Sequence, residues 1–99
     1  TVVTGPLTGG RHFCVLHGGI PVDCPGQDGP VSLEDDIARI DRVRTTMQCH
    51  RDRMDHILFN LVWADPCDSV QKKTVGQVGR GNRFVERETV DFCEKNNIA

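Results

Sequence analysis

Neither sign of charge dominates this sequence, and apolar residues are scarce. Twelve Lys and Arg residues stand against fourteen Asp and Glu residues, giving a formal net charge of -2 at pH 7. This balance excludes a nucleic-acid binder that acts through bulk positive charge. Hydrophobic residues make up 37% of the 99, and no apolar run approaches the roughly 20 residues that a transmembrane helix needs. We therefore expect neither a nucleic acid nor a membrane as a partner.

The first residues lack both the basic and the apolar region of a signal peptide. A chain of 99 residues allows at most one compact domain. The sequence starts at Thr1 without Met and ends at Ala99 without an evident cap. We expect residues 1–99 to be a single segment of a larger domain rather than a complete domain.

A closed set of disulfides is excluded because the number of cysteines is odd. The five are Cys14, Cys24, Cys49, Cys67 and Cys93. No two of them form a CxxC pair, and their share lies below the ~8–10% of a disulfide scaffold. The pattern favours a reduced, intracellular protein of the cytoplasm or nucleus. In that setting Cys14 and Cys93 act as small apolar side chains.

The first third of the chain predicts strands and a loop. A short apolar run at residues 12–16, followed by two glycines, indicates a buried strand. Residues 1–3 indicate a preceding strand, which residues 4–10 connect to it as a hairpin loop. From residue 20 to residue 31, prolines and glycines are too dense for a helix, so a loop is expected there.

Three helices are expected further along. Ser32 is a suitable N-cap, and acidic residues follow it, so a helix is predicted over about residues 33–44. Apolar residues at helical spacing predict a second helix over residues 54–62, which ends before Pro66. A third helix over about residues 86–96 is expected to bury these side chains: Val90 and Cys93, with Thr89 and Phe92.

The expected fold class is α/β, in the α+β sense, present as an incomplete segment. Residues 45–53 indicate a polar linker, and residues 67–83 a long, glycine-containing loop. One or two strands cannot make a sheet that covers the expected helices, so their apolar faces need partners from outside the segment.

Two residues are candidates for chemistry because of their glycine neighbours. His17 ends the expected buried strand and precedes Gly18 and Gly19, where the backbone can turn sharply. Ligands gather at the carboxyl ends of strands in open sheets, and neutral imidazole is a common metal ligand. Arg80 stands between two glycines in the long loop and is suited to binding an oxyanion bidentately. The alternatives are a structural histidine and a solvated arginine.

Two further possibilities are weaker. Trp63 and Asp65 follow the apolar face of the second helix, either as site residues or as a core tryptophan and a turn aspartate. A zinc site could use Cys14, His17 and Cys24, with Cys49 and His50 nearby, but the spacing does not give two close ligand pairs. No Walker A, GxGxxG, HExxH or GxSxG motif is present.

Five short blocks in a fixed order carry a family resemblance. They are FCVLHGGIP at 13–21, LEDDIARI at 33–40, NLVWADP at 60–66, GRGNRF at 79–84 and VDFCEKNNI at 90–98. Together they resemble the HGG strand, the acidic helix, the LLWSDP segment, the RG segment and the FLxxNxL helix of the metal-dependent Ser/Thr protein phosphatases. That family includes protein phosphatase 1, protein phosphatase 2A and calcineurin. The resemblance spans about residues 11–98.

The resemblance implies a calcineurin-like β-sandwich flanked by helices, and hydrolysis of phosphoserine or phosphothreonine. It implies two divalent metal ions (Mn, Fe or Zn), with His17 as a ligand of one of them. Arg80 would hold the substrate phosphate, and Asp65 would support the site. The implied partners are a phosphoprotein substrate and regulatory subunits.

The sequence also departs from the family. The motifs GDxHG, GDxxDRG and GNHE, which supply most metal ligands and the general acid, are absent, and so is the later strand with the final His ligand. Ala64 replaces the family's Ser, and residues 22–30 form an insert. We therefore expect the 99-residue chain to be inactive alone. The alternatives are a pseudophosphatase that serves as a binding or scaffolding module, and a small zinc-bound module.

Overall fold

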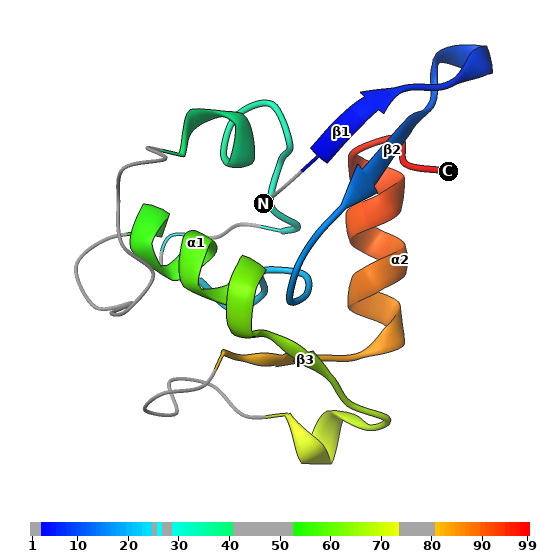
Figure 1. Cartoon of the computed structure of the whole chain (residues 1–99). Helices are drawn as coiled ribbons and strands as arrows, with labels where there is room; N and C mark the ends of the chain where they lie inside the picture. The colour runs from blue at the N-terminus through cyan, green and yellow to red at the C-terminus, as the bar shows by residue number, and fades with distance from the viewer. Residues whose placement is uncertain (1–2, 25, 27–28, 41–52, 74–80) are drawn as a thin grey trace.

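The computed structural model describes residues 3–24, 26, 29–40, 53–73 and 81–99. Its strands are β1 (Val3–Pro6), β2 (His12–Val15), β3 (Asp65–Pro66) and β4 (Arg83–Phe84). Its helices are α1 (Arg53–Trp63) and α2 (Glu86–Lys95), with short 3-10 helices η1 (Thr8–Gly10), η2 (Ile37–Arg39) and η3 (Val70–Lys72). The described part is thus a small mixed α/β structure with two helices and two two-stranded sheets. The two helices lie on either side of the segment that follows β2 (Figure 1).

A hairpin is present at the start of the chain, with β1 antiparallel to β2, but its first strand is Val3–Pro6. The prediction that residues 4–10 form the loop is therefore wrong for residues 4–6, and residues 1–2 of the predicted strand lie outside the described part. Phe13 stands opposite Gly5, and its ring occupies the space where a Cβ of Gly5 would lie. The prediction that β2 is buried is wrong, because Phe13 is 37% exposed and Val15 is 56% exposed. No second layer of described residues covers their face of this narrow sheet, whereas Leu16 packs against the core.

The end of the chain lies along β2. The N–H of His12 donates to the carbonyl of Asn97 (2.8 Å), and the N–H of Ala99 donates to the carbonyl of His12 (2.9 Å). Arg11 Nη2 donates to the carbonyl of Ile98 at 3.1 Å. These bonds form a short parallel bridge that joins the hairpin to the residues following α2.

The core is built around a segment without regular secondary structure. The absence of a helix in residues 20–31 agrees with the prediction as far as these residues are described. This segment nevertheless buries Ile20, Val22 and Val31, the last with no exposed surface. They pack with the following side chains: Cys24, Ile37, Ile40, Ile57, Leu61 and Phe92. The segment is therefore part of the core rather than a surface connection.

The prediction of a helix over residues 33–44 is wrong for residues 33–40, which the structure describes. Residues 33–36 form a turn and only η2 follows, after which Ile40 is extended, with ψ of 130°. Ser32 does cap this turn, because its Oγ accepts the N–H of Asp35 at 3.1 Å. The carboxylate of Asp36 in turn accepts the N–H of Ser32 at 2.9 Å, so the two side chains close the turn on each other. Residues 41–52, including most of the predicted linker, lie outside the described part.

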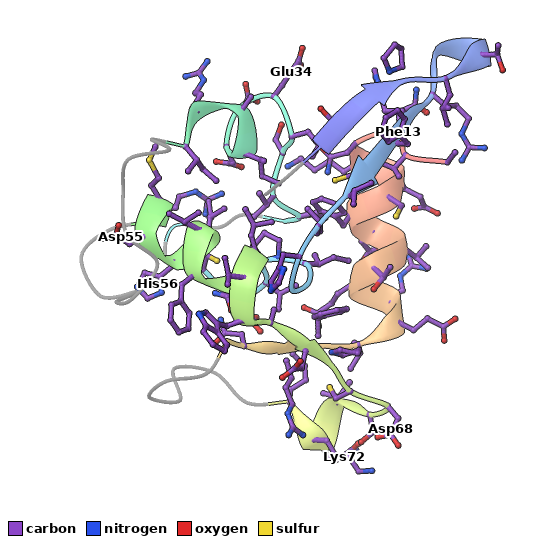
Figure 2. All side chains as sticks on the ribbon, viewed as in Figure 1. Phe13, Glu34, Asp55, His56, Asp68 and Lys72 are labelled. Carbon is purple, nitrogen blue, oxygen red and sulfur yellow. The ribbon has the colours of Figure 1, made fainter. Side chains whose placement is uncertain are left out.

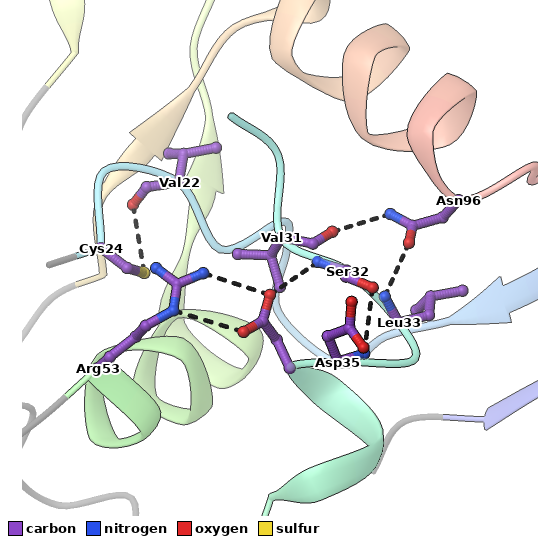
Figure 3. A network of polar contacts seen from close by, with 9 residues as sticks. Val22, Cys24, Val31, Ser32, Leu33, Asp35, Arg53 and Asn96 are labelled. Carbon is purple, nitrogen blue, oxygen red and sulfur yellow. Dashed lines mark hydrogen bonds and ion pairs between the residues drawn. The ribbon is translucent and has the colours of Figure 1, made fainter. Parts of the chain in front are cut away.

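Side chains from two distant helices hold this turn in place (Figure 3). Arg53, the first residue of α1, forms an ion pair with Asp36 at 3.3 Å. Asn96, which follows α2, accepts the N–H of Leu33 at 2.7 Å and donates to the carbonyl of Val31 at 2.9 Å. The turn therefore takes its shape from tertiary contacts as much as from its own sequence.

The other two predicted helices are confirmed, with small differences. The stripe that predicted α1 is buried at Ile57 and Leu61, each 2% exposed. In α2 the inward side chain is Phe92, at 2% exposed, whereas Val90 is 37% exposed. The predicted burial of Val90 is wrong because the inward-facing stripe of α2 passes through Phe92 and not through Val90. No helix in the described ranges is long and apolar enough to cross a membrane.

The ion pair of Asp36 predicts a loss of stability in acid. Burial favours the protonated carboxyl, but hydrogen bonds from Ser32 and Arg53, and the charges of Arg53 and Lys95, outweigh it and lower the pKa of Asp36 below its ordinary 3.8. The stabilisation is therefore complete above about pH 4 and is lost as the pH falls through the folded-state pKa. We expect the free energy of unfolding, measured with urea, to fall below pH 4.

The free energy of unfolding of the variant Asp36→Asn should fall less steeply below pH 4 than that of the parent chain. Glu34→Gln is the matched control, because Glu34 is an exposed acidic residue of the same turn. An equal pH dependence in the parent and in Asp36→Asn would contradict this assignment.

Candidate functional site

Three of the blocks that carry the family resemblance lie in contact. The turn that follows β2 meets the end of α1, where the N–H of Gly18 donates to the carbonyl of Leu61 at 2.7 Å. This bond satisfies one of the terminal carbonyls that a helix cannot satisfy itself. β3, which follows α1, pairs in parallel with β4, with Asp65 opposite Arg83. These strands lie below both helices in the view of Figure 1.

Three glycines allow this close contact. A Cβ on Gly18 would lie 2.8 Å from the backbone N of Trp63, and one on Gly19 would lie 3.0 Å from the carbonyl oxygen of Ala64. A Cβ on Gly81 would lie 2.7 Å from the carbonyl oxygen of Trp63. Gly18 and Gly19 were expected to provide a sharp turn, but neither has positive φ. Their role is to let two backbones approach each other.

A buried pair of asparagines holds the third segment in place. The N–H of Asn82 donates to Oδ1 of Asn60 at 2.6 Å, and Nδ2 of Asn82 donates to the carbonyl of Val22 at 2.8 Å. Nδ2 of Asn60 donates to the carbonyl of His56 at 2.8 Å. Asn60 is 2% exposed and Asn82 is 5% exposed. Because polar groups buried at this depth need partners, these bonds fix β4 against α1 and the 20–31 segment.

The predicted site residues are only partly brought together. His17 and Asp65 are both exposed, on the turn and on β3, and neither side chain has a hydrogen-bond or ion-pair partner among the described residues. Arg80 lies outside the described residues, directly before Gly81. Trp63 is 51% exposed, so the alternative of a core tryptophan is wrong. Its ring centroid lies 6.4 Å from that of Phe59.

An open cleft of about 730 Å³ lies beside β3 and β4. Asp65 and Arg83 line it, as do Asp68 and Lys72, whose side chains form an ion pair at 3.0 Å and are labelled in Figure 2. Arg83 forms no ion pair with another described residue, so its guanidinium is available to an anionic group in the cleft.

Lys73 connects two elements next to this cleft. Its Nζ lies 2.9 Å from a carboxylate oxygen of Asp23 and 2.8 Å from one of Glu88, near the start of α2. Burial would lower the pKa of Lys73, but hydrogen bonds to Glu88 and Asp23 outweigh it and raise that pKa above its ordinary 10.5. Lys73 is therefore charged at neutral pH and joins the segment after the glycine turn to α2.

The zinc site considered above is not formed. Cys14, His17 and Cys24 do not assemble into a group of ligands, and no set of three or more His, Cys, Asp or Glu residues does so within the described ranges. Cys49 and His50 lie outside those ranges. The described cysteines are thiols rather than disulfides. Burial, and then the neighbouring Cys93, raise the pKa of Cys14, as expected for a thiol that packs as an apolar side chain.

The sequence analysis missed Asn60, Asn82 and Arg83. Asn60 carried a usable signal, because a polar residue stands directly beside the apolar residues of the α1 stripe. Such a residue on a buried helix face needs a partner from another segment. Asn82 and Arg83 carried none. The role of Asn82 depends on its bonds to Asn60 and Val22, and that of Arg83 on the parallel pairing of two-residue strands.

The chain was compared with protein-family models, curated proteins and solved structures, and none of them matched.

Removing the asparagine contact should destabilise the chain. Asn60→Ala leaves the buried N–H of Asn82 without its acceptor, which typically costs about 1–3 kcal/mol. We expect a loss of that size in the free energy of unfolding, measured with urea. Arg87→Ala is the control, because its ion pair with Asp91 involves an Arg87 side chain that is 73% exposed. Equal losses in the two variants would show that the asparagine contact does not hold the site together.

Proposed function

We propose that this chain is part of a metal-dependent Ser/Thr protein phosphatase that hydrolyses phosphoserine or phosphothreonine. Its complete fold would be the family's β-sandwich flanked by helices. The observation that carries the proposal is the contact between the HGG turn, the segment containing Asp65, and the segment that begins at Gly81. Blocks 60 residues apart meet through glycine-mediated packing and the Asn60–Asn82 bond, as they would if they formed one site.

In this proposal Arg80 binds the phosphate. A guanidinium can hold two phosphate oxygens at once and offset the charge that develops on them during transfer. Gly81, the next residue, is packed against the end of α1, so Arg80 is joined to a fixed point of the fold. Asp65, which stands opposite Arg83 in the pairing of β3 with β4, supports the site in this proposal.

The family's two metal ions need more ligands than this segment offers. No three metal-binding side chains gather among the described residues, and His17 is the one candidate ligand that the resemblance assigns. The residues of this segment therefore do not fit a two-metal centre by themselves, and we derive no catalytic step through a metal. The remaining ligands would come from other parts of a longer protein, and this segment would contribute phosphate binding and His17.

Phosphate binding can be tested on the 99-residue chain. We expect inorganic phosphate to shift the backbone amide signals of Gly81 and Asn82 saturably in ¹⁵N NMR spectra. Arg80→Ala should weaken binding by about tenfold or more, the effect of losing about 1.4 kcal/mol from a charge-assisted bond. Arg87→Ala is the matched control, because it removes an exposed arginine of α2 that does not line the cleft beside β4.

Two results would contradict the proposal. One is the absence of saturable shifts, and the other is equal weakening in the two arginine variants. Phosphate binding combined with loss of the metal motifs elsewhere in the complete protein would instead favour the pseudophosphatase, a binding module without catalysis.

The 99-residue chain should have no phosphatase activity of its own. With Mn²⁺ present, we expect it to hydrolyse p-nitrophenyl phosphate and a phosphoserine peptide no faster than buffer, because two-metal catalysis needs ligands that the segment lacks. Release of inorganic phosphate is the measurement. Metal-dependent turnover that co-purifies with the chain and is lost in Arg80→Ala would show that the segment is a complete enzyme.

A further inference from the structure

A cavity of about 290 Å³ lies between the 20–31 segment and α2. Its floor is apolar and includes Val22, Val31 and Phe92, of which none is more than 4% exposed. Small-molecule sites usually span about 300–1,000 Å³, so this cavity has room for one long side chain rather than for a large ligand. Its lining includes residues 22–24 and 29–30, which belong to the insert that separates this sequence from the family it resembles.

The rim of the cavity is acidic. Asp23, Glu88 and Asp91 line it, and among the described residues no Lys or Arg does. The ammonium group of Lys73 forms ion pairs with both Asp23 and Glu88. Asp91 pairs with Arg87, but this pair is exposed and contributes little. Even with both neighbouring cations counted, the rim keeps an excess of negative charge that complements a cationic group.

The cavity is also held open by bonds that do not depend on a ligand. The carbonyl of Val22 accepts Nδ2 of Asn82, and the carbonyl of Val31 accepts Nδ2 of Asn96. Between these points Asp23 has positive φ, 55°, an uncommon conformation for an aspartate, and its carboxylate is held by Lys73. A site whose walls are already fixed loses little free energy to ordering when a ligand binds.

We propose that this cavity is a docking site for an arginine side chain presented by a partner peptide. The aliphatic stem would lie along Val22, Val31 and Phe92, as long cationic side chains lie along apolar surfaces. The guanidinium would reach the rim and bind Asp91 and Asp23. Arginine fits better than lysine because its planar head can bind carboxylates bidentately. The docking site does not use Arg80 and stands independently of phosphate binding.

The test is an NMR titration of the ¹⁵N-labelled 99-residue chain with the peptide acetyl-Ala-Arg-Ala-amide. We expect saturable shifts at the amides of Val22, Val31 and Phe92. The same peptide with citrulline in place of arginine has nearly the same shape without the charge, and it should bind about tenfold more weakly. Binding of the arginine peptide should also weaken as the NaCl concentration rises.

Variants make the assignment specific. Asp91→Asn should weaken the arginine peptide about threefold to tenfold, whereas Glu94→Gln, an exposed acidic residue on the same helix, should leave it unchanged. Lys73→Met should act in the opposite direction and tighten binding, because it releases two rim carboxylates. If Lys73→Met does not fold, Asp91→Asn and the citrulline peptide still decide the question.

Three results would overturn the proposal. The arginine and citrulline peptides could bind equally, Asp91→Asn could behave like Glu94→Gln, or the shifts could fall away from the cavity. Shifts at the cavity that grow with protein concentration in the absence of peptide would assign it to a second copy of the chain and would also overturn the proposal. Retention of peptide binding in Arg80→Ala, together with loss of phosphate binding, would separate this site from the proposed function.

Discussion

The buried bond between Asn60 and Asn82 is the contact on which the arrangement of the described structure depends. α1, the 20–31 segment and β4 come from three separate parts of the sequence, and the two asparagine side chains connect them. Apolar packing alone would hold such segments together without setting how one lies along another. A buried N–H that must find one particular oxygen sets that relation, because any other arrangement leaves a polar group unpaired.

The same logic extends through the core. A segment without helix or strand has main-chain groups that regular hydrogen bonding does not satisfy, yet here it supplies much of the buried apolar surface. Side-chain amides take over that task at both of its ends, Asn82 at Val22 and Asn96 at Val31. The segment can then be buried without leaving these two carbonyls unpaired. Its two fixed ends also shape the acidic cavity beside α2 and keep the glycine turn seated on α1.

Local periodicity predicted the parts of the fold that depend on local sequence. The apolar stripe of α1 follows from helical spacing, and its end follows from Pro66. The position of α2 and the presence of a hairpin also follow from local sequence. Local periodicity could not reveal that the helix predicted after Ser32 does not form. The side chains that hold this turn are those of Asp36, Arg53 and Asn96. Asn96, which accepts the N–H of Leu33, lies 63 residues away from it. The order of the motifs pointed to His17 and Asp65 as site residues. It did not point to Asn82, which bonds to Asn60 and to the carbonyl of Val22 in the structure. The reason given for Gly18 and Gly19 was also incomplete, since close packing is visible only once their neighbour is known.

The bridge between β2 and the residues after α2 has a consequence for the order of folding. Arg11 and Ile98 are 87 positions apart, so the hairpin acquires this neighbour only when almost the whole chain is available. Contacts between such distant residues form slowly because a long loop must close first. During synthesis, which proceeds from the N-terminus, β1 and β2 leave the ribosome before the residues after α2 with which β2 pairs. The edge of β2 at His12, which pairs with Ile98 in the folded chain, stays without that partner until then, and an unpaired strand edge can pair with the edge of another chain.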